Sequence, residues 1–376
     1  MYLPQHARNI TTSLFLVLSL SRIAAQAIPD TVACTPSTQT STQLSLLFVG
    51  DFMQHVAQIE AAQTDSGYCY NDCWQYVRDE ISRADIAVGN FETTLGGKPY
   101  SGYPSFSAPD EFFTSLVDAG FDIFLTSNNH SLDTGKRGIE RTISQMNKVE
   151  NIAQVGTYID RTDRDKRYPY IFEKNGIKIA LLNYTYGTNG LTETAPNIVN
   201  RIDTTIIAQD IAKAQAASPD AIIACMHWGV EYKQQPDKNQ QSLANWLLAH
   251  GVDHIIGSHP HVIQPLELRQ DSTGKEHLVV YSLGNYISNM KIRATDGGMM
   301  VRLVLEKDSS ITRVADCGYS LVYTARPVKS GKKNFELIPA ARPREEYSDA
   351  VKQGMQIFLD DTRKLLKTSN VAEYTF

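Results

Sequence analysis

Short apolar segments that each stop at a cluster of polar residues are the feature of this sequence that most limits its fold. Helix-like patterns separate these segments, so strand and helix alternate along the first two thirds of the chain. Such alternation is typical of an α/β fold built on parallel strands. We expect strands over 44–49, 86–88, 123–125, 177–183, 221–226 and 254–257, and helices over 72–83, 110–119, 135–149, 204–216 and 239–250.

The last third of the sequence has a different texture. After Leu278, strand-like segments follow one another and are joined by turns that contain Gly or Asp. An amphipathic helix is expected near 346–367. We therefore predict one large domain over 44–340 with a β-rich C-terminal part, and a C-terminal helix and tail over 341–376 that pack on it.

The N-terminus differs in kind from the rest of the chain. Arg8 precedes an apolar run over 14–20, and residues 25–27, Ala-Gln-Ala, supply the small-x-small pattern of a cleavage site. Residues 1–27 are therefore predicted to be a signal peptide, with a leader without export function as the alternative. The Ser-, Thr-, Gln- and Pro-rich residues 28–43 are expected to form a flexible tether.

Export would place the protein in the periplasm, on the cell envelope or outside the cell. No later segment reaches the roughly 18 to 20 apolar residues that a span requires, so no transmembrane span is expected in the mature chain. Cys34 leaves lipoprotein-type attachment open as an option. Exported proteins form disulfides, and Cys69 and Cys73 are the best candidate pair, whereas Cys225 lies in an apolar strand and is expected to be inert.

The balance of charge argues against two classes of binding partner. Charged residues make up 20% of the chain, and the formal net charge is -5 at pH 7. No excess of basic residues is available to bind a nucleic acid or an anionic membrane surface. Neither is therefore expected as a partner.

The polar clusters at the strand ends are suited to bind metal ions. In an open α/β sheet, ligands bind at the carboxyl ends of the strands. The clusters supply carboxylates, amides and imidazoles from separate segments, as a pair of divalent cations requires. Two such ions can clamp a phosphoryl group and activate water for phosphoester hydrolysis. The clusters are Gly50-Asp51 with His55, Gly89-Asn90-Phe91-Glu92, Asn128-Asn129-His130, Met226-His227 and Ser258-His259-Pro260-His261.

Each motif also has an ordinary structural explanation when it is taken alone. A single histidine such as His227 on an apolar strand is as often a buried, hydrogen-bonded residue, and Asn in a turn tolerates a left-handed backbone. The convergence of five motifs at strand ends is what favours a site. His250 and His254 flank Gly251 at a helix end and are expected to cap that helix instead.

Six sequence motifs carry a family resemblance. They are VGDFM, AVGNFETTL, TSNNHSLDTGKRGI, MHWGVEY, IIGSHPHVIQPLE and VYSLGNYI, and they extend from Leu46 to Ile287. With these motifs the chain resembles the bacterial capsule synthesis (CapA, or poly-gamma-glutamate biosynthesis) family, a branch of the calcineurin-like metallophosphatase superfamily. The resemblance implies a four-layer α/β/β/α sandwich of the metallophosphoesterase type, in which two β-sheets face each other.

The resemblance also implies roles for individual residues. Asn129 and His130 correspond to a catalytic pair in which His130 protonates or orients the leaving group. The superfamily's usual Asp-x-His is absent, since His55 follows Asp51 by four residues, and Glu92 is the only carboxylate where a bridging aspartate is expected. The metal ligands implied by the resemblance are Asp51, His55, Glu92, Asn129, His227, His259 and His261.

Four further residues are predicted to line the substrate. Glu231 and Tyr232 follow the His-Trp-Gly turn, Asn90 lies in the Gly-Asn-Phe-Glu motif, and Asn285 lies in the Tyr-Ser-Leu-Gly-Asn motif. For Glu231, Tyr232 and Asn285 the alternatives are a contact that supports the metal ligands and hydrogen bonding to nearby backbone.

Two functions fit these predictions. The first is a metal-dependent phosphoesterase-type hydrolase with two divalent ions, for which Mn, Fe, Zn and Mg are equally compatible, acting on a phosphate ester or an anionic envelope polymer. The second is a non-catalytic component of a capsule assembly apparatus that binds the polymer in the same pocket. Capsule assembly proteins are candidate partners in either case.

Overall fold

The first strand of the domain starts two residues before the expected boundary. The structure, a computed structural model, describes residues 41–309, 311–329, 331–342 and 345–376. Strand β1 (Thr42–Phe52) therefore includes the last two residues of the predicted tether. The signal peptide predicted over 1–27, the rest of the tether up to residue 40 and Cys34 lie outside the described residues.

A nine-stranded mixed sheet forms the first layer of β structure. Its order is β20-β17-β16-β1-β4-β5-β6, with β15 pairing with β1 and β21 with β17. Strands β1, β4, β5 and β6 are parallel, and β16, β17 and β20 continue the sheet in antiparallel pairs. The bounds are β4 (Ile86–Asn90), β5 (Ile123–Leu125), β6 (Ala153–Val155), β15 (Asn285–Ile287), β16 (Gly297–Asp308), β17 (Ile311–Ala325), β20 (Glu336–Pro339) and β21 (Ala372–Glu373).

A six-stranded sheet forms the second layer, in the order β13-β14-β12-β11-β9-β8. Its four central strands are parallel, and β13 and β8 are antiparallel edges. Every residue of β11 is buried, as expected for a parallel strand covered on both faces. The bounds are β8 (Tyr170–Lys174), β9 (Ile177–Thr185), β11 (Ala221–His227), β12 (His254–Ser258), β13 (Leu266–Gln270) and β14 (Glu276–Val280).

Alternate residues of β1 enter two different cores, which explains the layered arrangement. Leu46 and Phe48 belong to a core that also contains Ile223 of the second sheet. Leu47, between them, belongs to a second core that contains Phe112 of α4. Because successive side chains of a strand point to opposite faces, the first sheet separates the two cores.

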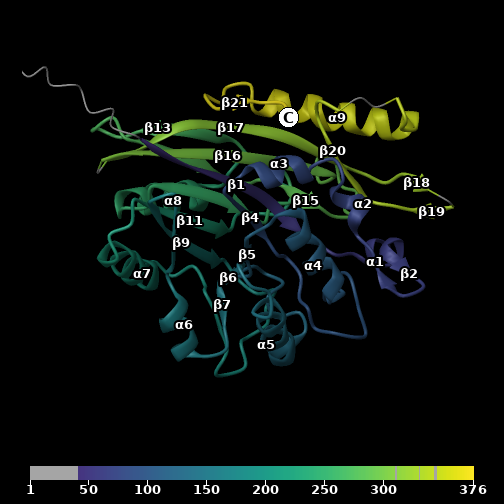
Figure 1. Cartoon of the computed structure of the whole chain (residues 1–376), viewed down its shortest axis with the longest axis horizontal. Helices are drawn as coiled ribbons and strands as arrows, with labels where there is room; N and C mark the ends of the chain where they lie inside the picture. Colours follow the sequence, from purple (N-terminus) through teal and green to yellow (C-terminus); the bar gives the residue numbers. More distant parts are fainter. Residues whose placement is uncertain (1–40, 310, 330, 343–344) are drawn as a thin grey trace, which may run out of the picture. The chain divides into compact units, whose positions relative to one another are not determined.

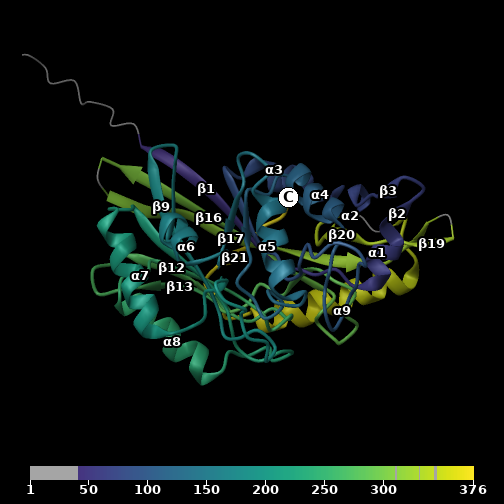
Figure 2. The ribbon, with the colours of Figure 1, turned by 90° about the horizontal axis from the view of Figure 1, so that it is seen from below.

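Helices cover the outer faces of the two sheets (Figures 1 and 2). Helices α3 and α4 pack on the first sheet, α7 and α8 pack on the second, and α9 packs against β17. The order helix, sheet, sheet, helix confirms the predicted α/β/β/α sandwich with its β-rich C-terminal part. The bounds are α1 (Val56–Ala62), α4 (Asp110–Ala119), α5 (Gly135–Met146), α6 (Arg161–Arg167), α7 (Thr204–Ala216), α8 (Lys238–Ala249) and α9 (Asp349–Leu365).

Three pairs of two-residue strands complete the described fold. They are β2 (Gln63–Thr64) with β3 (Gly67–Tyr68), β7 (Thr157–Tyr158) with β10 (Ile198–Val199), and β18 (Val328–Lys329) with β19 (Lys332–Lys333). Within the ranges that the structure describes, no helix combines the length and the apolar composition needed to cross a bilayer.

One predicted helix is interrupted. Residues 72–83 contribute to two short helices, α2 (Asn71–Trp74) and α3 (Arg78–Arg83). The Val77 N–H donates to the Trp74 carbonyl at 3.0 Å, which closes a tight turn between them. The apolar spacing suggested one helix because Trp74 and Val77 are both buried in the same core.

Cys69 and Cys73, the candidate disulfide pair, are both free thiols, as are Cys225 and Cys317. Cys69 is exposed, whereas Cys73 lies on the buried face of α2. The two side chains therefore face different surroundings despite their short separation in sequence. Burial raises the pKa of the Cys73 and Cys225 thiols, so both stay protonated and inert.

Candidate metal centre

Strands of both sheets end at the same region of the sandwich. In the first sheet, β1 carries Asp51, and the segments after β4 and β5 carry Glu92 and Asn129. In the second sheet, β11 ends in His227, and the turn after β12 carries His259 and, two residues later, another histidine. All these side chains are buried. The convergence that the sequence predicted is therefore present.

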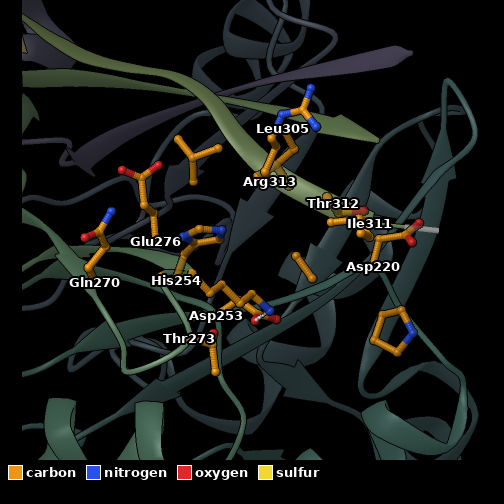
Figure 3. Close-up of a pocket in the computed structure, with 15 residues that line it drawn as sticks. Asp220, Asp253, His254, Gln270, Thr273, Glu276, Leu305, Ile311, Thr312 and Arg313 are labelled. Atoms are coloured by element: carbon orange, nitrogen blue, oxygen red, sulfur yellow. Dashed lines mark hydrogen bonds and ion pairs between the residues drawn. The ribbon is translucent and has the colours of Figure 1, made fainter. Parts of the chain in front are cut away.

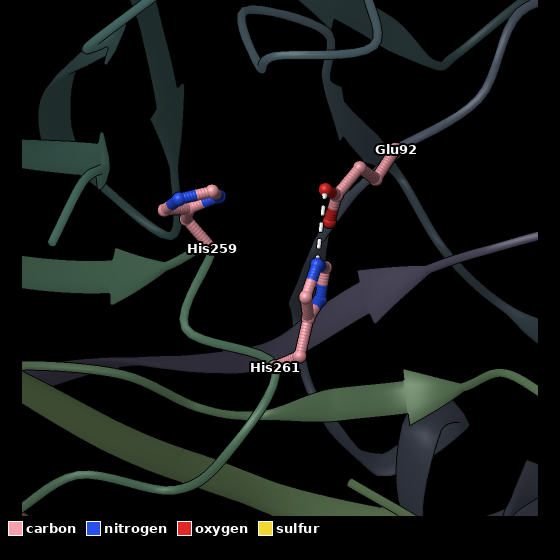
Figure 4. A group of neighbouring side chains, drawn as sticks. All are labelled: Glu92, His259 and His261. Atoms are coloured by element: carbon pink, nitrogen blue, oxygen red, sulfur yellow. Dashed lines mark ion pairs between the residues drawn. The ribbon is translucent and has the colours of Figure 1, made fainter. Parts of the chain in front are cut away.

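The Glu92 carboxylate lies at the centre of this group. Its Oε1 is 3.6 Å from His227 Nε2 and 3.7 Å from His261 Nε2. Figure 4 shows the His261 ring next to the Glu92 carboxylate, with a dashed line for their ion pair, and His259 on the far side of the space between them. Two sets of ligand atoms, each within 4.8 Å of one another, include it: Glu92 with His259 and His261, and Glu92 with Asp51 and His227. One carboxylate is thus shared by two candidate ion positions.

Asp51 is held from two sides. Its Oδ1 accepts a hydrogen bond from Asn90 Nδ2 at 2.7 Å, and its Oδ2 lies 3.2 Å from His261 Nδ1. Asn90 Nδ2 is also 3.5 Å from Glu92 Oε2. Asn90, predicted to line the substrate, therefore lies among the predicted ligands themselves.

His227 pairs with the predicted amide ligand. Its Nε2 lies 2.8 Å from Asn129 Oδ1, and its Nδ1 lies 3.2 Å from Ser258 Oγ. Asn129 Nδ2 donates to Asn189 Oδ1 at 3.2 Å, which turns the Asn129 oxygen toward the histidine. His227 and Asn129 thus present a nitrogen and an oxygen donor at one point of the site.

Two buried atoms in the centre have no hydrogen-bond partner in the described part of the chain, Glu92 Oε1 and His259 Nδ1. Leaving such an atom unpaired costs roughly 1–3 kcal/mol, and a bound cation would offset this cost. Carboxylate oxygens and neutral imidazoles are the donors that divalent transition metals accept. The residues present therefore fit divalent cations.

Burial sets the protonation of the predicted ligands. It lowers the pKa of His227 and His259 well below the ordinary value, and neighbouring histidines add to the shift. Burial, with the charge of Asp51 nearby, raises the pKa of Glu92 well above its ordinary value. Neutral imidazole is the form that binds metal, and a cation beside Glu92 would favour its ionised form.

His130 has a rigid support of its own. Its Nδ1 lies 2.7 Å from Asp133 Oδ2, and its ring packs edge-on against Phe106 with 4.6 Å between the centroids. The Phe106 backbone N–H donates to the same Asp133 oxygen at 2.7 Å. The ring is thus oriented through Nδ1, and Nε2 has no hydrogen-bond partner in the described part of the chain.

His55 belongs to neither of the two ligand sets found among the described residues. It precedes α1, where its Nδ1 lies 3.2 Å from Gln58 Oε1 and 3.2 Å from the donating N–H of Asn289. Burial lowers the pKa of His55 to about 4. Its four-residue spacing from Asp51 carries it into the turn that opens α1, outside the ligand cluster.

The other predicted substrate contacts divide between the rim of the site and its interior. The Glu231 side chain is 40% exposed and its Oε1 lies 4.0 Å from His261 Nε2. Tyr232 is half-exposed, with its ring 6.2 Å from that of His261. Asn285 is buried, with its Oδ1 3.1 Å from His261 Nδ1 and its Nδ2 donating to the Thr295 carbonyl at 2.8 Å. Asn285 thus orients the His261 ring through its Nδ1 atom.

Three supporting residues received no role from the sequence. Asn128 Nδ2 donates to the backbone of the segment after β4 at 2.9 Å, and its Oδ1 accepts the His130 N–H at 3.1 Å. Asp133 follows His130 by three residues, a spacing that signals contact in a helical turn. The contact of Ser258 with His227 had no such signal, because it depends on the pairing of β11 with β12.

A separate cavity of about 780 Å³ lies at the opposite ends of the strands (Figure 3). Its walls come from the amino ends of β11, β12 and β14 and from β16 and β17, and they include His254. The His254 Nδ1 accepts the Leu278 N–H at 3.0 Å. The prediction that His254 caps a helix is wrong, because β12 places it against β14, whereas His250 does cap α8.

The fold and the site together define a class of protein, an α/β sandwich with a buried carboxylate–imidazole centre suited to divalent cations. Within that class the chain belongs to the family described as bacterial capsule synthesis protein PGA_cap, which matches residues 45–290.

Two relatives support this assignment. The chain is 28% identical over 290 residues to the PGA biosynthesis protein CapA of Bacillus subtilis (strain 168), a match that covers 73% of this chain and 72% of the relative. It is 26% identical over 310 residues to the capsule biosynthesis protein CapA of Bacillus anthracis, covering 78% and 72%. The family is thus one involved in capsule and PGA biosynthesis.

Solved structures with a related arrangement include a calcineurin-like phosphoesterase, YfkN from Bacillus subtilis. That likeness has a TM-score of 0.45 at 15% identity and covers 88% of this chain and 100% of the other. The NAD nucleotidase of Haemophilus influenzae gives a TM-score of 0.48 at 12% identity, over 88% of this chain. The chain spans 64% of the length of that nucleotidase chain.

Proposed function

We propose that this chain is an exported, metal-dependent hydrolase of the phosphoesterase type that acts in the biosynthesis of a capsule or a poly-gamma-glutamate-like surface polymer. The observation that carries the proposal is the buried Glu92 carboxylate, which lies among three histidines and has an Oε1 without a hydrogen-bond partner among the described residues. A buried carboxylate of this kind is costly unless a cation meets it.

The chain's own side chains would hold and orient the ions. Bound divalent ions polarise a phosphoryl oxygen and activate water for attack. Asn285 and Ser258 fix the rings of His261 and His227 through hydrogen-bond contacts, and such outer partners keep ligand geometry precise. The ligands would be Asp51, Glu92, Asn129, His227, His259 and His261.

His130 would supply the proton to the leaving group. Asp133 engages Nδ1 of its ring and Phe106 packs against the ring, so His130 is held in one orientation. With the Nδ1 proton donated to Asp133, the imidazolium form of His130 would carry a second proton on Nε2 and give it to the departing oxygen, leaving a neutral ring, which is the role of a general acid. Asn129, which precedes His130 in the segment after β5, would place its amide oxygen beside that leaving group and the ions.

The biological setting of the proposal comes from the family and from the N-terminal sequence. Both relatives are named for capsule or PGA biosynthesis, which favours a phosphate ester or an anionic polymer of the envelope as substrate. The signal-peptide pattern over 1–27 supports export to the periplasm, the envelope or the medium. Capsule assembly proteins would then be available as partners.

One observation favours the alternative, a non-catalytic component that binds the polymer. The family resemblance leads us to expect a bridging aspartate in the segment 89–92, where Asn90, whose amide donates to Asp51, brings no charge and Glu92 is the only carboxylate. An amide contributes no negative charge, so ions in this centre would be bound less tightly than by an aspartate. A weakly held ion can serve to bind an acidic polymer without turning it over.

The test is metal content combined with turnover. The purified full-length chain, prepared without chelator, is analysed for Mn, Fe, Zn and Mg and assayed with aryl phosphate mono- and diesters. We expect bound metal, activity lost in a chelator and restored by metal, and a fall of about 100-fold or more in His130→Ala with metal retained. His250→Ala, at the end of α8, is the matched control and should leave both unchanged. Absence of metal, or activity unchanged in His130→Ala, would contradict the proposal.

A further inference from the structure

Exposed tyrosine rings surround the centre. Tyr103, Tyr186 and Tyr232 are 75%, 47% and 39% exposed. The Tyr186 ring lies 4.4 Å from the His259 ring, and the Tyr232 ring lies 6.2 Å from that of His261. Large aromatic side chains gain free energy from burial, so exposed rings grouped at a site indicate a surface that a ligand covers.

Tyr103 lies in a loop over residues 101–107 that contacts His130 through Phe106. Backbone hydrogen bonds between Ser101 and Ser107 close this loop, at 3.0 and 2.9 Å. The Tyr103 ring packs 6.5 Å from that of Phe106, whose backbone N–H donates to the carboxylate that orients His130. The position of Tyr103 is thus coupled to that of the proposed general acid.

Tyr186 and Tyr232 are also fixed rather than free. The Tyr186 N–H donates to the His227 carbonyl at 2.9 Å. The Tyr232 N–H donates to the Pro260 carbonyl at 2.8 Å, and its φ of 65° is a strained value for a tyrosine. Strain of this kind persists where a side chain must be held in one place and is common at binding sites.

The charged group on this rim is acidic. The Glu231 carboxylate lies 4.0 Å from His261 Nε2, and Glu231 directly precedes Tyr232 in the chain. A negatively charged group would be repelled here, whereas a hydroxyl can donate to the carboxylate.

We propose that Tyr103, Tyr186, Tyr232 and Glu231 form a subsite for an uncharged, hydroxyl-bearing ring in the leaving group of a phosphate ester. The ring stacks on the tyrosine faces and a ring hydroxyl donates to Glu231, while the phosphate faces the buried ligands. This inference deepens the proposed phosphoesterase function and rests on it. A sugar phosphate and a nucleoside phosphate share this chemistry.

The test measures binding, so it does not depend on turnover. The His130→Asn chain, loaded with Mn²⁺, is titrated by calorimetry with glucose 1-phosphate, with adenosine monophosphate and with glycerol phosphate, which has no ring. We expect at least one ring-bearing phosphate to bind about 10-fold more tightly than glycerol phosphate, since stacking on one aromatic side chain strengthens binding by about 5-fold or more. The ring-bearing ligand that binds more tightly shows whether the subsite takes a sugar phosphate or a nucleoside phosphate.

Variants separate the subsite from the metal centre. Tyr103→Ala, at a largely exposed position that will not disturb folding, should weaken the ring ligand by about 5-fold and leave glycerol phosphate within about 2-fold. Tyr186→Phe keeps the ring face and should retain the preference that Tyr186→Ala loses. Ile311→Ala, exposed at the far end of the sheets, is the control.

Two outcomes would overturn the inference. One is equal binding of ring-bearing and ringless phosphates, and the other is an equal loss of both in Tyr103→Ala and Tyr186→Ala. A chain that binds the ring ligand by this pattern but hydrolyses no phosphate ester would retain the subsite and refute the catalytic proposal. The failures of the two proposals are therefore distinguishable.

Discussion

The two ends of the second sheet use polar residues in opposite ways. At the amino ends, Asp220 and Asp253 accept the N–H groups of Lys178 and Ile222, each at 2.7 Å. At the carboxyl ends, His259 buries a ring nitrogen that has no partner in the described part of the chain. Polar groups that are satisfied within the protein stabilise the fold, whereas a buried group without a partner needs an explanation, and a bound cation would supply one for His259.

The first sheet repeats the arrangement at its amino ends. Asp122 accepts the Ala87 N–H and Asp85 accepts the Ser45 N–H, each at 2.8 Å. An aspartate ahead of one strand thus closes the hydrogen-bonding pattern at the start of its neighbour in both sheets. These aspartates stabilise the amino ends of both sheets, and the candidate metal centre lies at the other end.

The largest contrast should come from Glu92→Gln at the carboxyl end. Metal affinity should fall by at least about 100-fold, because outer partners alone account for about 10- to 100-fold. The metal-free protein should be as stable or more stable, because the variant replaces a buried, poorly paired acid by a neutral amide. Metal titration and urea unfolding in chelator measure the two effects. A destabilised metal-free variant would contradict this account of the centre.

Asn285→Ala removes an orienting contact without removing a ligand. The His261 ring would lose its contact with Asn285 Oδ1, and we expect metal affinity to fall about 10- to 100-fold. Metal titration of the purified variant measures the loss. If Asn285 instead touched substrate, metal affinity would stay constant and only KM would rise. Asn334→Ala, a partly buried asparagine whose contacts lie outside the centre, is the matched control.

Asp253→Ala tests the amino end. The buried Ile222 N–H would lose its acceptor, which should lower the free energy of unfolding by about 1–2 kcal/mol. The ion pair with Lys275 is half-exposed and adds little, so Lys275→Gln should cost less than about 0.5 kcal/mol. Urea unfolding measures both, and metal binding should not change in either variant. Loss of metal binding in Asp253→Ala would contradict the view that the amino ends stabilise the fold while only the carboxyl ends bind metal.

The smallest effect concerns the pH dependence of His254. Burial lowers the pKa of His254 to about 4 in the folded protein, so below the unfolded value of about 6.5 the unfolded chain binds more protons. Its contribution to stability is complete above that value and is lost as pH falls, by about 1 kcal/mol between pH 6.5 and pH 5.5. His254→Gln, which keeps an acceptor for the Leu278 N–H, should show a shallower pH dependence. Identical pH profiles would show that His254 titrates normally.

The α/β alternation and the converging strand ends were predictable from the sequence, because both follow from local patterns, whereas the four-layer arrangement was expected only from the family resemblance. Apolar runs, helical spacing and polar strand ends gave the expected α/β alternation, and helices such as α4 and α7 match the expected bounds. The interrupted helix and the free Cys69 were not predictable. Both depend on which side of a turn faces the core, and the spacing of apolar residues in the sequence does not determine this.

Within the site, the limits of sequence reasoning are set by sheet register. Glu92 was placed at the site only as a substitute for an absent aspartate, yet it occurs in both ligand sets. Asn90 and Asn285 were assigned to substrate from the family-like motifs in which they lie. Parallel pairing of β1 with β4 and β15 instead turns both amides inward. The long-range pairing of strands, not the residue type, decides whether a side chain is a ligand, supports a ligand or lies on the rim of the site.

The direction of β1 also fixes where the chain enters the domain. The strand begins at Thr42, and Asp51 lies near its other end. Nine residue steps of extended strand span about 30 Å. The point at which the chain enters the described fold therefore lies about 30 Å along β1 from the Asp51 carboxylate, at the end of the strand opposite the candidate metal centre.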